Sequence, residues 1–248
     1  MKKIDVAEVT AYVERNIGGF HSKRLQRMQK LRLTDVLRRK NPYLFKAKNI
    51  LIAHDLVKTL LDAYLSSQEE TIFGDFLEGL AIFISRQACG GNKSSAEGID
   101  LEFDRGRKRY IVAMKSGPNW GNSSQIRKMR EDFTKAKRVL RTSGVRLEVV
   151  AVNGCCYGRN NSPDKGDHFK YCGQEFWEFI SGSRDLYVDL IVPLGHRAKE
   201  KNERFLKEYA KIVNTFTEEF SKRFCAGGEI DWEALVRFNS AISRSTKK

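Results

Sequence analysis

Two short segments, residues 99–103 and 109–115, are rich in aliphatic and aromatic side chains and are separated by a polar turn that contains Gly106. Apolar-rich segments joined by a few polar residues with a glycine are typical of a β-hairpin. The sequence therefore predicts two antiparallel strands. This pairing constrains the fold more than any other segment does, because it fixes which side chains lie near one another.

Side chains on the predicted hairpin alternate between the two faces of the sheet. Asp100 and Glu102 therefore share one face, and Lys115 shares a face with Ala113. If the register places Asp100 opposite Ala113, then Lys115 lies one same-face step from Asp100. A carboxylate that holds a divalent cation beside a lysine suits phosphodiester hydrolysis, because the cation helps to generate hydroxide and the lysine offsets phosphate charge.

The overall charge of the chain favours a polyanionic partner. Its 248 residues contain 45 Lys and Arg against 31 Asp and Glu, which gives a formal net charge of +14. A positive field of this kind concentrates nucleic acid and makes its binding depend steeply on salt. Together with Asp100 and Lys115, the charge indicates metal-assisted cleavage of a nucleic acid, whereas charge alone also fits a basic surface with no particular partner.

The apolar segments and the cysteines indicate where the protein is located and whether its thiols are reduced. The N-terminus has no long apolar run of the secretory type, and no segment approaches the roughly 20 apolar residues that cross a bilayer. These features predict a cytoplasmic protein without membrane association. The five cysteines are odd in number and include the adjacent Cys155 and Cys156, which favours reduced thiols over a set of disulfides.

The periodicity of apolar residues predicts helices and strands in a mixed order. The expected helices cover most of residues 4–65 and then 71–87, 124–140, 174–180, 199–224 and 230–242, and the expected strands are 99–103, 109–115, 147–152 and 186–192. This order indicates an α/β fold, in which a mixed sheet is flanked by helices and carries helical extensions at both termini.

We expect three regions along the chain. They are an N-terminal helical region at residues 1–66, a core at 67–195 and a C-terminal helical region at 196–248. The two terminal regions carry amphipathic helices whose apolar faces need partners. These helices could form a dimerisation subdomain, or the same faces could be satisfied within one chain.

The predicted hairpin belongs to a longer set of motifs. The set comprises residues 69–71, 73–74, 77–78, 115–118, 153–158 and 171–177. Through these residues, most of the chain from 40 to 240 resembles the PD-(D/E)xK nuclease superfamily. Within that superfamily it is most similar to type II restriction endonucleases that cut GG and CC pairs separated by a central base. The resemblance implies a restriction-endonuclease-like fold for the core.

The resemblance also implies roles for two residues of the hairpin. Asp100 is similar to the metal-binding aspartate of the superfamily, and Lys115 is similar to its catalytic lysine. The alternative for this pair is an ordinary surface charge pair. The second carboxylate of the superfamily stands two residues before the lysine, and here that position is Ala113, which offers no ligand. A replacement acid is therefore required from elsewhere.

Glu78 is the first candidate for this replacement, because it lies on the helix before the sheet, where some superfamily members place their acid. Glu102 is the second candidate, on the correct face but on the far side of Asp100 from the lysine. The alternatives are a solvated helix residue for Glu78 and a cross-strand ion-pair partner for Glu102. Met114 would add its backbone carbonyl, a donor that suits Mg²⁺.

Two polar segments near the lysine strand are candidates for contact with DNA. Side-chain amides and arginines can read base edges, whereas lysines mostly hold phosphates. The first segment contributes Trp120, Asn122, Ser123, Gln125, Arg127 and Lys128, and the second, the polar loop at 159–170, contributes Arg159, Asn160, Lys165 and Lys170. A loop of this length is often functional, although it would also serve as a plain surface connection.

Cys155, Cys156, His168 and Cys172 raise the question of a zinc site, since thiolates and imidazole bind zinc. Their spacing matches none of the common zinc-finger patterns. Buried core thiols are the alternative interpretation, and we favour it.

The resemblance and the charge together predict a magnesium-dependent type II restriction endonuclease of a restriction-modification system. We expect a homodimer that cuts both strands of double-stranded DNA at a short palindrome of the GGNCC type. Two other functions stay open. One is a non-catalytic DNA-binding protein that lost its second carboxylate at Ala113, and the other is a nuclease that recognises the structure or the ends of DNA or RNA.

Overall fold

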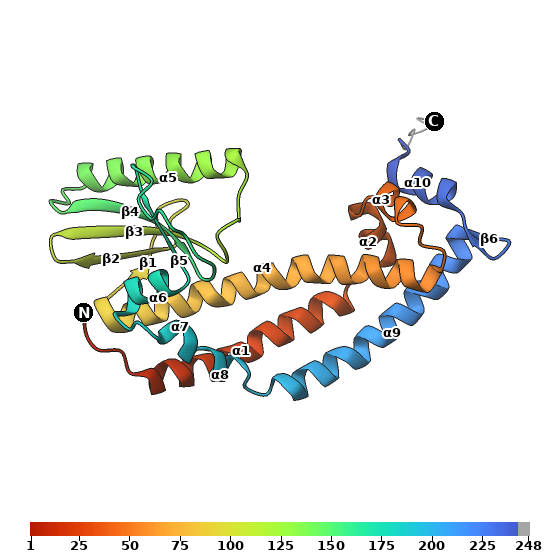
Figure 1. Cartoon of the computed structure of the whole chain (residues 1–248), viewed down its shortest axis with the longest axis horizontal. Coiled ribbons are helices and arrows are strands. Elements are labelled where there is room, and N and C mark those ends of the chain that lie inside the picture. The colour runs from red at the N-terminus through yellow and green to blue at the C-terminus, as the bar shows by residue number, and fades with distance from the viewer. Residues whose placement is uncertain (243–248) are drawn as a thin grey trace. The chain divides into compact units, whose positions relative to one another are not determined.

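The structure of the chain is a computed structural model that describes residues 1–242. The chain folds as two compact units. The first unit comprises Met1–Phe20 and Phe73–His196, and the second comprises His21–Ile72 and the residues from Arg197 onward. Two long helices, α1 (Val6–Gln29) and α4 (Ala53–Cys89), contribute residues to both units (Figure 1).

A five-stranded mixed sheet forms the centre of the first unit. Its strands are β1 (Asn92–Lys93), β2 (Leu101–Arg105), β3 (Lys108–Lys115), β4 (Glu148–Cys155) and β5 (Phe169–Cys172), and they lie in that order across the sheet. Neighbours from β1 to β3 are antiparallel, whereas β3, β4 and β5 run parallel. The predicted hairpin is therefore the pair of β2 and β3. Its turn contains Gly106 at a φ of 63°, in the left-handed region that favours glycine.

Helices cover both faces of this sheet (Figure 1). Side chains alternate along β3, so that Val112 belongs to the same buried cluster as Leu80 of α4. The neighbouring Ile111 points the other way and shares a cluster with Met129 of α5 (Ser123–Thr142). This arrangement confirms the predicted α/β fold with a mixed sheet between helices.

Three short helices follow β5. They are α6 (Gln174–Ser181), α7 (Leu186–Asp189) and α8 (Ile191–Leu194). The strand expected at residues 186–192 is wrong, because this segment forms α7 and α8 instead. Leu186 and Leu190 are buried four residues apart, while Ile191 and Val192 are 68% and 83% exposed. Burial at a spacing of four is helical, and β5 takes the place beside β4.

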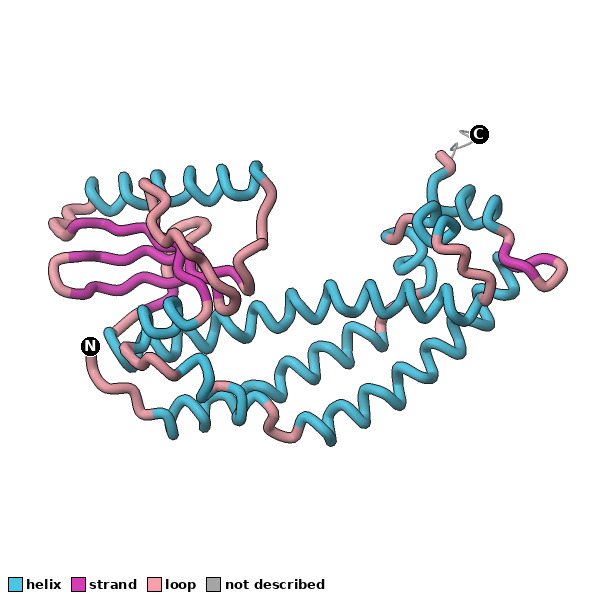
Figure 2. Tube along the Cα trace, in the orientation of Figure 1, coloured by secondary structure: helices cyan, strands magenta, loops and turns pink. Residues whose placement is uncertain are grey.

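The second unit is mostly helical (Figure 2). Besides parts of α1 and α4 it contains α2 (Leu33–Arg39), α3 (Pro42–Ala47), α9 (Ala198–Phe224), α10 (Trp232–Ser240) and a small hairpin of β6 (Cys225–Ala226) and β7 (Glu229–Ile230). Its core combines leucines of α4 with phenylalanines of α9, among them Leu56, Leu61, Phe216 and Phe220. A role of the terminal helical regions in dimerisation stays a prediction.

The longest helix, α4, has 37 residues. Even so, no helix within residues 1–242 combines the length and the apolar character that crossing a membrane requires.

Candidate active site

Asp100 lies at the point where β2 begins. Its backbone N–H donates to the carbonyl of Val112 at 2.9 Å, although the ladder of β2 and β3 already pairs Leu101 with Val112. Two consecutive residues, Asp100 and Leu101, are thus directed to Val112, as in a β-bulge, whereas the sequence predicts Asp100 opposite Ala113. The side chain turns along the edge of β3, where its Oδ2 accepts a hydrogen bond from the backbone N–H of Met114 at 2.6 Å. The carboxylate is thus fixed against the strand that carries Lys115.

Lys115 is the last residue of β3. Its Nζ lies 4.9 Å from the centroid of the Trp120 ring, a distance at which a cation is attracted to an aromatic face. None of the ion pairs in the described part of the chain involves Lys115. Its ammonium therefore lies over the indole without a direct ion pair to a carboxylate in residues 1–242.

Glu78 reaches the same end of β3 from α4. One helical turn earlier, Gly74 lies so close to the strand that a Cβ there would stand 3.0 Å from Oγ of Ser116. Residues four apart share a face of a helix, so Glu78 is directed to the neighbourhood of this strand end. Its Oε1 accepts a hydrogen bond from Nζ of Lys93, on β1, at 3.1 Å. Glu78 is thus paired with a lysine and does not point freely into solvent.

Glu102 lies on β2 opposite Ile111. Its Oε2 accepts a weak hydrogen bond from the hydroxyl of Ser94 at 3.4 Å. Because β2 and β3 are antiparallel, a residue opposite Ile111 is displaced from the Lys115 end of the strand. Glu102 thus lies away from the Lys115 end of β3, and the choice between Glu78 and Glu102 as the replacement acid stays a prediction.

The charge environment of Asp100 links these side chains electrostatically. Burial raises the pKa of Asp100, and the negative charge of Glu78 acts in the same direction. The hydrogen bond from Met114 and the charges of Lys115 and Lys93 lower the pKa and offset part of that rise. Two partly shielded carboxylates that repel each other form a site at which added positive charge is favourable.

A buried amide lies beside the lysine. Asn153, on β4, is in register with Ala113 and is 1% exposed. Its Nδ2 donates to the carbonyl of Ala113 at 3.2 Å, and its Oδ1 accepts from Nε1 of Trp120 at 3.2 Å. Asn153 has no role of its own among the sequence-based predictions, although a polar residue directly after the apolar run of residues 149–152, and on the same strand, is a signal that could have revealed it.

The cysteines proposed for zinc are buried in the first unit. Cys155 and Cys172 are neighbours on β4 and β5, and burial raises the pKa of the Cys155 thiol, with the nearby Cys172 acting in the same direction. Nδ1 of His168 instead lies 2.8 Å from Oδ1 of Asp167. Within residues 1–242, no three His, Cys, Asp or Glu side chains are grouped so that they could hold a metal ion. These thiols therefore fit a core role, and the zinc alternative gains no support.

The start of α5 uses two of the expected DNA contacts for its own cap. The Asn122 side chain accepts from the backbone N–H of Gln125, and the Gln125 side chain accepts from the backbone N–H of Asn122, both at 3.0 Å. This reciprocal capping box stabilises the helix start. Ser123 is the first residue of the helix. Contact of these three residues with DNA stays a prediction.

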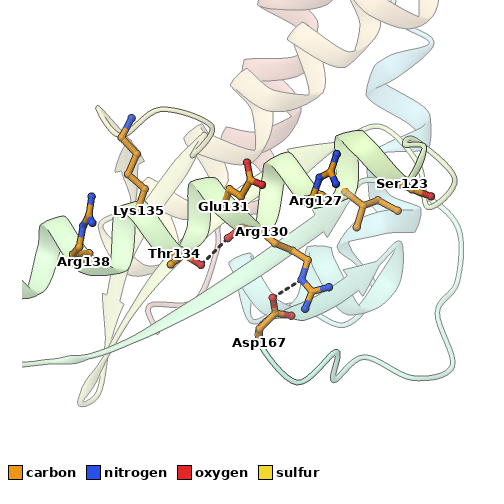
Figure 3. A pocket seen from close by; sticks show the side chains of 9 residues that line it. Ser123, Arg127, Arg130, Glu131, Thr134, Lys135, Arg138 and Asp167 are labelled. Atoms are coloured by element: carbon orange, nitrogen blue, oxygen red, sulfur yellow. Dashed lines mark hydrogen bonds and ion pairs between the residues drawn. The ribbon is translucent and has the colours of Figure 1, made fainter.

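A groove of about 830 Å³ runs along α5 (Figure 3). Arg127 and Arg138 line it and have no ion-pair partner within residues 1–242. Arg130 also lines the groove, but its guanidinium meets the carboxylate of Asp167 at 2.6 Å. Lys128 is likewise paired, with Asp132 at 2.6 Å. The two unpaired arginines leave the groove positively charged.

The polar loop at residues 159–170 is anchored beside the segment that follows β3. Nζ of Lys170 donates to the carbonyl of Pro118 at 2.7 Å. Asn160 donates to the carbonyl of Lys170 at 2.9 Å and accepts from Nζ of Lys165 at 3.3 Å. Arg159 lines a separate pocket of about 530 Å³ next to Cys156. The loop thus brings several cations near the strand that carries Lys115.

A comparison with protein-family models assigns the chain to a family. Residues 7–202 match the model of type II restriction endonuclease EcoO109I. The chain belongs to this family. The matched range of the EcoO109I family includes the whole five-stranded sheet together with Glu78, Asp100 and Lys115. A search of curated proteins found no match.

Membership of the EcoO109I family confirms the predicted class of enzyme. Type II restriction endonucleases are nucleases, so the chain is a hydrolase of phosphodiester bonds with DNA as its substrate. This conclusion agrees with the net charge of +14, because a basic surface attracts the phosphates of DNA.

Proposed function

We propose that this restriction endonuclease depends on Mg²⁺ and acts as a homodimer that cuts both strands of a short palindromic site of the GGNCC type. The observation that carries the catalytic part is the fixed Asp100 carboxylate. It is held by the Met114 N–H at 2.6 Å, on the strand that ends at Lys115 and beside the negative charge of Glu78. This arrangement supports Asp100 and Lys115 as an acid and lysine pair of the PD-(D/E)xK type.

The donor set fits a hard cation. Asp100 and Glu78 are two carboxylates, and Mg²⁺ in nucleotide and nucleic-acid enzymes is usually bound by one or two carboxylates together with substrate phosphate and water. The Met114 carbonyl would supply a third oxygen. Because the N–H and C=O of a strand residue point to the same edge, that carbonyl is directed to the edge on which Asp100 binds the N–H. A bound Mg²⁺ would supply charge stabilisation and a more acidic water.

The side chains of the site have separate tasks in this mechanism. Asp100 and Glu78 hold positive charge against the scissile phosphate. Lys115 orients the attacking water and offsets the charge that develops on the phosphate oxygens. Ala113, at the usual place of the second carboxylate, takes no part, so that task passes to Glu78. Glu102 stays a second candidate for it.

Contact with DNA is proposed for residues around this strand end. The expected set is Trp120, Asn122, Ser123, Gln125, Arg127, Lys128, Arg159, Asn160, Lys165 and Lys170. The unpaired Arg127 in the groove of α5 and the lysines of the anchored loop support it. A palindrome and two cuts follow from a two-fold symmetric dimer, which would present one site to each strand.

Cleavage of a mixed-sequence plasmid in the presence of Mg²⁺ tests the proposal. Discrete fragments with identical ends at GGNCC sequences are expected, and no fragments should form in EDTA. Asp100→Ala and Lys115→Ala should abolish cleavage while specific binding persists. Lys108→Ala is a matched control on the same strand, because that lysine pairs with Glu148 and should leave cleavage unchanged.

A second candidate function is favoured by one observation, the alanine at position 113. A chain that has lost a ligand could bind DNA without cutting it. An intact plasmid, retained by the protein at all Mg²⁺ concentrations, would support that function and would contradict ours. Cleavage set by DNA ends or by RNA structure would instead indicate a structure-specific nuclease.

A further inference from the structure

A closed chain of contacts surrounds Lys115. It begins at the carbonyl of Ala113, passes to the amide of Asn153 and continues to the indole N–H of Trp120, each step at 3.2 Å. It ends where the Trp120 ring faces Nζ of Lys115 at 4.9 Å. The chain of contacts therefore leaves β3 at one residue and returns to the same strand two residues later.

Asn153 makes this chain of contacts rigid. It is 1% exposed, and both ends of its amide are hydrogen-bonded. A buried amide that lost either partner would be strongly penalised. Asn153 also lies directly beside Ala113 on the neighbouring parallel strand, so its position is set by the sheet. The orientation of the indole is thus dictated by the sheet and not by the loop on which Trp120 lies.

The small residue at position 113 contributes to the same arrangement. Ala113 is 1% exposed and belongs to the buried cluster against which Trp120 packs. The indole therefore lies against the part of the sheet where the superfamily pattern would put a carboxylate. A carboxylate there would attract the lysine as an ion pair, whereas the indole attracts it through its aromatic face.

We propose that Trp120 is a positioning residue, which holds the amine of Lys115 at the reactive end of β3, and that Asn153 fixes Trp120 in this orientation. This inference rests on the proposed function of Lys115 as the catalytic lysine. It differs from the expectation that Trp120 contacts DNA, because it assigns the effect of the indole to the rate of cleavage and not to the affinity for DNA.

The decisive measurements are the single-turnover cleavage rate at saturating DNA and the Kd for cognate DNA with Ca²⁺ in place of Mg²⁺. Trp120→Leu should lower the rate about 100-fold, the scale expected when a catalytic group is misplaced by about 1 Å. The Kd should stay within about twofold of that of the unaltered protein. A rise in Kd with an unchanged rate at saturation would overturn the proposal in favour of DNA contact.

Trp120→Phe is the conservative variant and also serves if the leucine variant does not fold. It keeps an aromatic face but loses the N–H that bonds to Asn153. We expect a rate between those of the unaltered protein and Trp120→Leu, with the same Kd. Asn153→Leu should lower the rate in the same way, and combining it with Trp120→Phe should add little, because both changes break the hydrogen bond between Trp120 and Asn153. Fully additive losses would contradict the assigned role of Asn153.

A test without DNA separates failure of this inference from failure of the proposed function. Urea unfolding of Lys115→Met, Trp120→Leu and the double variant forms a double-mutant cycle. The midpoint shift of the double variant should be smaller than the sum of the two single shifts. Additive shifts would mean that the lysine and the indole do not interact, whether or not the protein cuts DNA.

Discussion

Nζ of Lys93 lies 3.1 Å from Oε1 of Glu78, and the positive charge of Lys93 also acts on Asp100. One ammonium thus serves both carboxylates that are proposed to bind the metal. The Lys93 side chain is 69% exposed, whereas that of Glu78 is 29% exposed. The lysine can therefore swing away into solvent while the acids stay in place. In the protein without metal, Lys93 supplies the positive charge that the two acids need.

Competition between Lys93 and the metal leads to the first prediction. Lys93→Met should raise the affinity of the protein for Ca²⁺ or Mg²⁺ about two- to fivefold, the range expected from removing an exposed ion pair. Isothermal titration without DNA measures this. Lys108→Met is the matched control, since Lys108 pairs with Glu148 on the same sheet. Equal affinities for both variants would show that Lys93 does not compete.

A change from glutamate to glutamine at each position shows whether Glu78 or Glu102 is the replacement acid. Glu78→Gln should lower the cleavage rate by more than about 100-fold, because even changes outside the ligand shell cost about 10- to 100-fold. Glu102→Gln should leave the rate nearly unaltered, because Glu102 lies opposite Ile111, away from the end of β3. Single-turnover cleavage at several Mg²⁺ concentrations measures both. The reverse order of effects would assign the replacement acid to Glu102.

The raised pKa of Asp100 predicts a definite dependence of stability on pH in the protein without metal. Burial, followed by the charge of Glu78, opposes ionisation in the folded state. The stabilising contribution of the protonated form is fully present below the ordinary pKa of about 3.9 and is lost as the pH rises through the raised value. Asp100→Asn, which cannot ionise, should therefore be more stable than the unaltered protein at neutral pH.

Asp104, on β2, provides a control whose pKa is shifted in the opposite direction. Its hydrogen bond with Arg109 lowers the pKa of Asp104, so this carboxylate stabilises the fold above the ordinary pKa and loses its effect as the pH falls through the lowered value. Asp104→Asn should be less stable at neutral pH, with a difference that shrinks in acid. Urea unfolding in EDTA measures both profiles. A parallel pH dependence of the two variants would contradict the assigned environments.

The hairpin of β2 and β3 could be predicted because the relevant information is local. Alternation of side chains and a glycine turn are sufficient to predict the ladder that places Leu101 opposite Val112 and Glu102 opposite Ile111. The helix expected at residues 124–140 is found as α5 for the same reason, because helical periodicity is also local. The secondary structure of residues 186–192 could not be predicted, because a short apolar run is compatible with a strand and with a helix. Only the burial of Leu186 and Leu190 settles it.

The partners of the catalytic side chains could not be predicted, because they come from elements far apart in the sequence. Lys93 reaches Glu78 across 15 positions, and Trp120 reaches Asn153 across 33. No periodicity encodes such contacts. The acid that replaces the carboxylate absent at Ala113 could not be predicted for the same reason. Which acid approaches Asp100 depends on how α4 packs on the sheet.

Gly154 provides a test of the packing that supports the site. It lies on β4 beside Met114, and a Cβ at this position would stand 2.3 Å from the Phe176 ring, which is fully buried. Since the ring cannot move into solvent, Gly154→Ala should lower the free energy of unfolding by about 1–3 kcal/mol. Gly19→Ala, inside α1 with nothing within 4 Å, should instead raise it by about 0.5–1 kcal/mol. Urea unfolding of both variants measures these two changes in the free energy of unfolding. If Gly154→Ala were as stable as the unaltered protein, there would be room for a methyl group between β4 and the Phe176 ring of α6.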